Sequence, residues 1–238
     1  MIARLLNFSR DRAPVPPLPE RPVYAIGDLH GRADLLARRL AELEEGVHLV
    51  TLGDYVDRGP DSAGVLRQLM GRPDTTCLMG NHEDMLLRFL DAPDANGPQW
   101  LRHGGWQTLA SFGVAIPDPA DPDGRARAAE GLAEAMGEEM LDWLRNLPLA
   151  HQSGNIAFVH AGADPTRAIE EQDPQVLLWG HRGFTQRSRR DGLWIVHGHT
   201  VVEQPRILPG RIPLDTGAYA TGRLSVALFA DGGVRFLP

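Results

Sequence analysis

The sequence has very little cysteine and no long apolar run, and each shortage excludes a class of protein. The single cysteine among the 238 residues is Cys77, so no intramolecular disulfide can form and a metal site built from several thiolates is excluded. No segment approaches the roughly 20 apolar residues that a transmembrane helix needs. Residues 1–13 are too mixed in character for a signal peptide. We therefore predict a cytoplasmic protein with no membrane partner.

The sequence also lacks an excess of basic residues. Its 24 Lys and Arg are outnumbered by 31 Asp and Glu, which gives a formal net charge of −7. A nucleic-acid-binding surface needs a basic stripe that neutralises phosphates. The one local basic run, Arg187–Arg190, is typical of a solvated loop, so we predict no nucleic-acid partner. The 42% hydrophobic and 23% charged residues are usual for a globular chain long enough for one substantial core.

The chain changes character at Pro22. Prolines make residues 14–22 a stiff, extended lead-in, and residues 1–8 are either a short amphipathic helix or a mobile tail. Residues 23–238 are predicted to form a single domain with a helical insertion at about residues 91–150, which walls one side of the site. Within this helical insertion we expect loops at 91–98 and 117–124, a helix over 100–109 interrupted by a glycine pair, and one or two helices over 125–147.

Five short apolar runs have the length and composition of buried strands, and each ends in glycine or polar residues. They are Val23–Ile26, Leu49–Leu52, Thr75–Met79, Ile156–Val159 and Leu193–Val196. Helices are expected at residues 33–45, 62–70 and 83–90, from the spacing of their apolar residues. Because strands and helices alternate, parallel pairing through right-handed crossovers is the default for the first three strands.

The C-terminal part is rich in strands. The turn Asp231-Gly232-Gly233 predicts a hairpin of strands Leu224–Phe229 and Val234–Leu237, and shorter strands are expected at 206–208 and 212–214. We expect these strands to form a second, mostly antiparallel sheet. The predicted fold is therefore α/β, a sandwich of two mixed β-sheets flanked by helices.

Oxygen and imidazole donors follow all five strands of the first set. Because ligands in α/β sheets bind beyond the carboxyl ends of strands, we expect neighbouring strand ends to bring these side chains together. The candidate metal ligands are Asp28, His30, Asp54, Asn81, His160 and His199. Such a set suits Mn, Fe or Zn. Six ligands suit two divalent ions rather than one, with Asp54 as the bridging carboxylate.

These strand ends also carry a family resemblance. The motifs are Gly27-Asp28-Leu29-His30-Gly31, Gly53-Asp54-Tyr55-Val56-Asp57-Arg58-Gly59, Gly80-Asn81-His82-Glu83, His160-Ala161-Gly162 and Gly198-His199-Thr200. In this order they resemble the phosphoprotein phosphatases, a family of calcineurin-like metallophosphoesterases, from about Val23 to the C-terminus. The resemblance implies that fold, two divalent ions (Mn first), and a bacterial or phage type of serine/threonine protein phosphatase.

The resemblance also implies roles for individual residues. A hydroxide shared by the two ions would attack phosphorus directly, His82 would be the general acid, Asp57 would hold its ring, and Arg58 would clamp phosphate oxygens. A second phosphate-binding arginine is expected near Trp179. Arg182 lies one residue away from the expected spacing, and Arg187 is the competing candidate.

Two positions near the last motif refine this interpretation. The resemblance implies that His199 binds the metal and that His197 supports the site without binding the metal itself. Many phosphodiesterase relatives carry another histidine two residues after that ligand, where this chain has Val201. Val201 therefore favours phosphatase activity on a phosphorylated protein or a small phosphoester.

Two alternatives remain open at this point. A symmetrical bis(5'-nucleosyl)-tetraphosphatase would share the metal ligands and the late segment Leu214–Gly217, but that branch resembles this chain less well at Asp57. An inactive metal-binding or partner-binding module is expected to have lost at least one ligand. All six candidate ligands and His82 are present in this chain, which argues against the inactive module.

Overall fold

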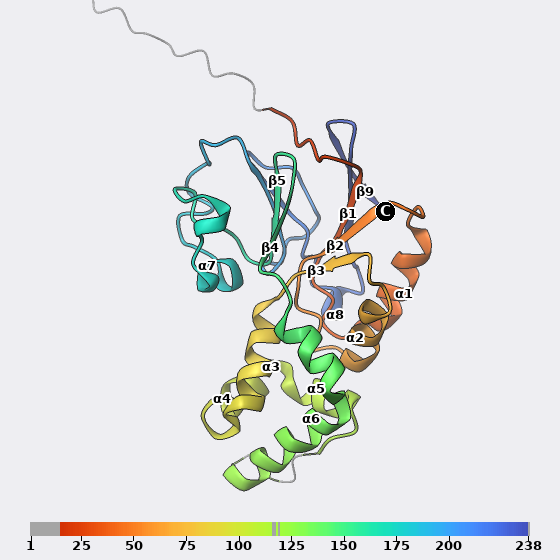
Figure 1. Ribbon diagram of the computed structural model, residues 1–238, viewed down its shortest axis with the longest axis vertical. Helices are drawn as coiled ribbons and strands as arrows, with labels where there is room; N and C mark the ends of the chain where they lie inside the picture. The colour runs from red at the N-terminus through yellow and green to blue at the C-terminus, as the bar shows by residue number, and fades with distance from the viewer. Residues whose placement is uncertain (1–14, 116–117, 119, 238) are drawn as a thin grey trace, which may run out of the picture.

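The computed structural model describes residues 15–115, 118 and 120–237 (Figure 1). The helix or tail expected at residues 1–8 lies outside these residues. Residues 15–22 enter the first strand without helix or strand structure, and they lie along the second sheet. Trp194 donates its indole N–H to the carbonyl of Val15 at 2.8 Å, and the backbone N–H of Leu18 donates to the Asn155 side chain at 2.7 Å.

The first sheet contains five strands in the order β3-β2-β1-β8-β9. They are β1 (Val23–Ile26), β2 (His48–Thr51), β3 (Thr75–Cys77), β8 (Val226–Ala230) and β9 (Gly233–Leu237). The expected parallel pairing holds for β1, β2 and β3, which are connected through helices α1 (Ala33–Glu42) and α2 (Ser62–Met70). Strand β8 is antiparallel to β1, and β9 is antiparallel to β8.

The second sheet contains four strands in the order β4-β5-β6-β7. They are β4 (Ala150–Ser153), β5 (Ile156–Val159), β6 (Trp194–His197) and β7 (Arg211–Pro213). Strand β4 is antiparallel to β5, whereas β5, β6 and β7 are parallel. The prediction of two mixed sheets is therefore confirmed.

The prediction of a second, mostly antiparallel sheet that contains the C-terminal hairpin was wrong in two respects. Two of the three pairings in the second sheet are parallel, and the hairpin is not part of it. Strands β8 and β9 extend the first sheet beside β1 instead of joining the second sheet. The free edge of β1 accepts β8 because both strands are buried, and Phe229 then packs between the sheets. The strand expected at 206–208 is reduced to one bridge between Leu208 and Arg211, since Pro205 and Pro209 flank it without N–H donors.

The helical insertion contains more helix than expected. Its elements are α4 (Pro93–Trp100), a turn (Leu101–Gly105) kinked at Gly104, α5 (Trp106–Ser111) and α6 (Pro122–Arg145), which is kinked at Gly137. Helix α4 replaces the loop expected at 91–98, because Pro93 occupies the first helical turn, where no N–H is needed. Helix α6 begins inside the loop expected at 117–124, because Asp121 caps the N–H groups of Asp123 and Gly124.

The helical insertion and α3 (Asn81–Asp91) form a helical lobe next to the carboxyl ends of the first sheet (Figure 1). The shorter helices α7 (Pro174–Trp179) and α8 (Ala218–Thr221) and the 3₁₀ turn Ile169–Glu171 lie in the connections between later strands. One apolar core lies between the two sheets and includes Val50, Phe158 and Val196. A larger core joins the other face of the first sheet to the helices. Both faces of the first sheet are thus covered, which holds the ends of its strands in place.

Candidate metal centre

The predicted ligands converge where the two sheets and the start of α3 meet. Asp28 and His30 follow β1, Asp54 follows β2, Asn81 opens α3, and His160 and His199 follow β5 and β6. We expected neighbouring strand ends, and the structure instead takes them from two sheets. The side chains of the first sheet therefore meet those of the second across the open edge of the sandwich.

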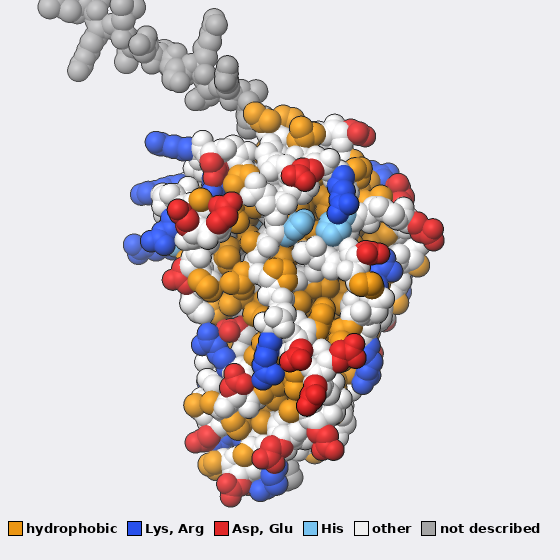
Figure 2. Space-filling view, viewed as in Figure 1, with side chains coloured by type: hydrophobic (Ala, Val, Ile, Leu, Met, Phe, Trp, Pro, Cys, Tyr) orange, Lys and Arg blue, Asp and Glu red, His pale blue; other side chains and the backbone are white. Residues whose placement is uncertain are grey.

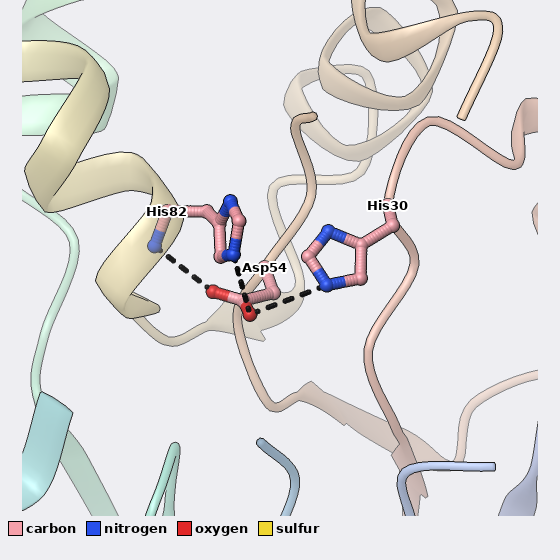
Figure 3. A group of neighbouring side chains, drawn as sticks. All are labelled: His30, Asp54 and His82. Carbon is pink, nitrogen blue, oxygen red and sulfur yellow. Dashed lines mark hydrogen bonds and ion pairs between the residues drawn. The ribbon is translucent and has the colours of Figure 1, made fainter. Parts of the chain in front are cut away.

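Asp54 belongs to two groups of potential metal ligands. One group is His30, Asp54 and His82, and the other is Asp54, His160 and His199, with all ligand atoms of each group within 4.8 Å of one another. The Nε2 atom of His30 lies 3.4 Å from Oδ2 of Asp54, and the Nε2 atom of His160 lies 3.3 Å from Oδ1. Figure 3 shows the first group, in which the ring nitrogens of His30 and His82 face Oδ2 of Asp54, while His160 of the second group lies nearer Oδ1. Asp54 is therefore placed between the two groups, as a bridging ligand would be.

Asn81 and Asp28 contact the second group in different ways. The side-chain oxygen of Asn81 lies 2.8 Å from Nε2 of His160 and 2.9 Å from Nδ1 of His199. The carboxylate of Asp28 accepts the backbone N–H of His199 at 3.0 Å. The third side chain of the first group is His82, with its Nε2 atom 3.9 Å from Oδ2 of Asp54, and Asp28 is not one of the three.

Two of the histidines are oriented by backbone carbonyls. His30 donates through Nδ1 to the carbonyl of Val56 at 2.8 Å, and His160 does the same to Leu52 at 2.8 Å. In each case Nε2 is left facing Asp54, which is the arrangement that fixes a metal-binding tautomer. Burial lowers the pKa of His30 to about 3 and the pKa of His199 to about 4, so both rings are neutral at neutral pH and free to donate to a cation.

Several buried carboxyl groups crowd the site. Asp28, Asp54, Glu83 and Asp215 are all buried around it. Burial and the neighbouring carboxylates of Asp215 and Asp54 raise the pKa of Asp28 well above its usual value. Uncompensated buried carboxylates are costly, and divalent cations would offset that cost. Neutral imidazoles beside crowded carboxylates therefore fit a pair of divalent ions.

The backbone is strained at the same place. Among the described residues, the non-glycine positions with a left-handed backbone are His30, Asp54, Asp57, Arg58, His199 and Asp231. All of these except Asp231 are candidate site residues. Each such conformation costs of order 1–3 kcal/mol and persists only where its surroundings enforce it. The fold therefore maintains unfavourable backbone geometry where the candidate ligands are presented.

His82 and Asp57 form a buried pair beside the first group. The Nδ1 atom of His82 lies 2.6 Å from Oδ2 of Asp57. Burial alone would lower the pKa of His82, but the carboxylates of Asp54 and Asp57 outweigh it and raise that pKa. Burial raises the pKa of Asp57, opposed by its hydrogen bonds with His82 and Thr108. The pair thus favours a protonated imidazole whose Nε2 atom faces the candidate metal groups.

Arg58 is half-buried and points at the first group. Its Nη1 atom lies 3.2 Å from Nε2 of His30, and its guanidinium stands 5.0 Å from the ring centre of Tyr219. A phosphate oxygen bound there would meet both the guanidinium and the candidate metal groups.

The other predicted arginines lie elsewhere on the surface. Arg182 and Arg187 are exposed and line one depression together with Asp164 and His181. Figure 2 shows basic side chains gathered along this margin of the molecule, on the side that carries α7. His197 is buried, donates through Nδ1 to the carbonyl of Gly198 at 3.0 Å and packs against Phe184. A phosphate-binding role for Arg182 stays a prediction, and so does the role of each predicted site residue.

Glu83 is a site residue that the sequence reasoning missed. Its buried carboxylate accepts the backbone N–H groups of Asp54, Tyr55, Val56 and Gly80. Burial and Asp54 raise its pKa to about 8, while these donors oppose the rise. The available signal was its position in the first turn of α3, where an acidic side chain reaches back to the preceding backbone. Glu83 thereby ties the loop that carries Asp54 to the start of α3.

Comparison with known proteins decides the family. The model of the calcineurin-like phosphoesterase family matches residues 21–214. The chain belongs to this family. The expected resemblance is thus confirmed, and the chain is a metallophosphoesterase whose His and Asp side chains form a metal-binding cluster.

The relatives carry two kinds of name. Serine/threonine-protein phosphatase 2 of Escherichia coli is 41% identical over 227 residues, which cover 86% of this chain and 91% of that protein. A symmetrical bis(5'-nucleosyl)-tetraphosphatase of an Acidovorax species is 34% identical over 158 residues, covering 63% of this chain and 47% of that protein. The solved structure of a cold-active protein-tyrosine phosphatase of Shewanella shares the fold, with a TM-score of 0.60 at 16% identity over 95% of this chain and 83% of that one.

The described helices also bear on the membrane prediction. Among residues 15–115, 118 and 120–237, each helix is too short or too polar to cross a bilayer.

Proposed function

We propose that this metallophosphoesterase is a phosphomonoesterase that acts as a serine/threonine protein phosphatase. The observation that carries the proposal is the position of Asp54, shared by two groups of metal ligands, with the His82–Asp57 pair and Arg58 on one side of it. A shared carboxylate, a proton donor and a guanidinium are the parts that direct hydrolysis of a phosphomonoester requires.

We assign Asp28, His30, Asp54, Asn81, His160 and His199 to two divalent ions. The donor set of imidazoles, carboxylates and one amide suits Mn first, with Fe and Zn as alternatives. Bound there, the ions would supply an activated water as the nucleophile.

The chain's own residues complete the reaction in this proposal. Arg58 neutralises charge on the phosphate oxygens as it grows in the transition state. His82 gives its Nε2 proton to the departing alkoxide oxygen, and Asp57 stabilises the imidazolium through Nδ1. Arg182 is the candidate for a further phosphate contact, with Arg187 as its competitor.

The symmetrical tetraphosphatase is a second candidate, because relatives bear that name. Its leaving group is a nucleoside diphosphate, which departs as a stable anion and needs little help from an acid. A serine alkoxide is a much poorer leaving group and needs a proton. The 2.6 Å contact between His82 and Asp57, buried beside the candidate metal groups, therefore favours the phosphomonoester.

Steady-state hydrolysis by the metal-stripped and Mn-loaded protein tests the proposal. The substrates are a phosphoserine peptide, a phosphotyrosine peptide, diadenosine tetraphosphate and a bis-aryl phosphodiester. We expect Mn-dependent turnover with preference for the monoesters. Preference for the tetraphosphate would select the second candidate. An Mn-loaded protein that hydrolyses none of the four would instead support an inactive metal-binding module.

A further inference from the structure

The helical insertion reaches the site through Trp100 and Thr108. The indole Nε1 of Trp100 donates to both carboxylate oxygens of Asp57, at 3.1 and 3.0 Å. The hydroxyl of Thr108 donates to Oδ1 of Asp57 at 2.6 Å. All of these side chains are buried, so water does not compete for the carboxylate. Asp57 is therefore surrounded by donors from a segment about 45 residues away in the chain.

The direction of these hydrogen bonds is determined by chemistry. An indole N–H can only donate. The Thr108 hydroxyl has one proton and accepts the backbone N–H of Asp57 at 2.9 Å, while Ser62 lies 3.1 Å from it. The Thr108 hydroxyl donates to Oδ1 of Asp57, and the Trp100 indole donates to both carboxylate oxygens, so these contacts favour an ionised Asp57 that accepts from His82. That requires the Nδ1 atom of His82 to carry a proton.

The geometry of the donors is itself enforced. The ring of Trp100 stacks on Phe89 with centroids 4.5 Å apart, and a Cβ atom at Gly105 would lie 2.5 Å from that ring. The backbone carbonyl of Gly104 accepts the N–H of Arg58 at 3.3 Å. The glycine pair thus lets the chain turn closely enough to contact Asp57 and Arg58.

We propose that Trp100 and Thr108 are positioning residues that keep Asp57 an acceptor and hold His82 as the Nδ1-protonated proton donor. This inference rests on the proposed phosphomonoesterase function. In the reaction, water oxygen forms a bond to phosphorus while the bond from phosphorus to the serine oxygen breaks. The serine oxygen takes the Nε2 proton of His82, and the proton released from water restores it. The products are the alcohol and inorganic phosphate.

Dependence on the leaving group distinguishes this role from a purely structural one. A serine alkoxide needs the proton of His82, whereas nitrophenolate leaves readily without one. A misoriented His82 should therefore slow hydrolysis of a phosphoserine peptide much more than hydrolysis of p-nitrophenyl phosphate. General damage to the site would slow both substrates alike.

The variants are Trp100→Phe, which keeps the ring and removes the N–H donor, Thr108→Val, which removes the hydroxyl, and the double variant. The matched controls are Trp106→Phe and Ser111→Ala, on the same helical segment and without a contact to Asp57 among the hydrogen bonds of the described residues. We expect kcat/KM for the phosphoserine peptide to fall roughly 10- to 100-fold in the double variant, mainly through kcat. For p-nitrophenyl phosphate we expect a fall of less than about 5-fold. Mn content and inhibition by inorganic phosphate should be retained.

Histidine side-chain ¹⁵N NMR of the Zn-loaded protein provides a readout that needs no turnover. At a pH where the ring of His82 is neutral, we expect the Nδ1–H tautomer in the wild type and a mixture of tautomers in the double variant. An unchanged tautomer, or an equal loss on both substrates, would overturn the positioning role. If the wild type is inactive but its His82 tautomer differs from that of the double variant as expected, the proposed function is overturned and the positioning role stands.

Discussion

The two sides of Asp54 are built differently. On the first side, His30 and His82 are buried, and each has its Nδ1 atom held by a hydrogen-bond acceptor. On the second side, His160 is equally buried, but His199 is half-buried and its Nδ1 atom faces Asn81, one of its proposed fellow ligands. The indole of Trp179, which is exposed, stands 6.3 Å from the ring of His199.

This difference suggests that the two sides have different roles in the proposed reaction. The first side carries the pair His82–Asp57 and Arg58, and the helical insertion braces both through Trp100, Gly104 and Thr108. The second side consists of donors on loops after β5 and β6, and it opens toward solvent. A proton donor must be held accurately, because an error of about 1 Å costs roughly 10²-fold in rate. Metal ligands on the open side tolerate more movement, since an ion can adjust its coordination.

Asp54→Asn should produce the largest effect, because Asp54 is the one residue common to both sides. Losing a bridging charge removes several kcal/mol of transition-state stabilisation, so we expect turnover to fall about 10³-fold or more. Bound Mn, measured by elemental analysis, should fall below two ions per chain. The far-ultraviolet circular dichroism should stay unchanged. Substantial activity in this variant would show that the two groups do not act through a shared carboxylate.

Arg58→Ala tests whether phosphate is bound from the first side. We expect kcat to fall roughly 10²- to 10³-fold, the usual result of removing a group that stabilises transition-state charge, while the fold is retained. Arg182→Ala and Arg187→Ala are the matched changes in the surface depression that both residues line. Both residues are exposed, so we expect a smaller effect than that of Arg58→Ala, seen as a raised KM. Only one of these two variants should show it. If either of these variants loses more activity than Arg58→Ala, the main phosphate contact is made in the depression that Arg182 and Arg187 line.

The convergence of the candidate ligands was predictable from sequence because each lies within a few residues of an apolar run. Asp28 and His30 follow β1, and Asp54 follows β2, so strand position alone brings them to one edge. The assignment of strands to sheets was not predictable in the same way. Val23 pairs with Phe229 across almost the whole chain, and no local pattern indicates which free edge accepts the C-terminal hairpin.

The sequence predicted that the helical insertion would wall one side of the site, but not which of its residues contact Asp57. Trp100 and Thr108 contact Asp57 across sequence separations of 43 and 51 residues, and both look like ordinary helix-packing residues. The prediction of a loop at 91–98 was wrong for a different reason. Pro93, Asn96 and Gly97 favour turns by composition, yet packing of α4 against α3 and α6 outweighs these weak preferences.

Gly104→Ala should weaken the contact between the Gly104 carbonyl and the Arg58 N–H without changing any polar side chain. A Cβ atom there would lie 2.5 Å from the backbone nitrogen of Arg58, so the segment must shift. We expect kcat/KM to fall roughly 10- to 100-fold. Gly113→Ala is the matched control, because its φ is also positive (75°) but nothing lies within 4 Å of the added atom. Gly113→Ala should lose about 1–2 kcal/mol of stability in urea unfolding from its left-handed backbone alone, and Gly104→Ala should lose more because the added atom also meets the Arg58 backbone. Equal activities would mean that Gly104 does not position Arg58.

The smallest effect concerns His197, which lies behind the second side and is 5% exposed. Burial lowers its pKa in the folded protein from 6.5 to about 4. As the pH falls below about 6.5 the unfolded chain binds a proton that the folded chain does not, so His197 destabilises the fold progressively until about pH 4. The total is about 3 kcal/mol at 1.36 kcal/mol for each pKa unit. In metal-free protein, His197→Gln should therefore reduce the loss of unfolding free energy between pH 7.5 and pH 4.5 by about 2 kcal/mol, measured by urea titration. If variant and wild type lose the same unfolding free energy, His197 is protonated in the folded protein as readily as in the unfolded chain. Water would then reach the His197 ring.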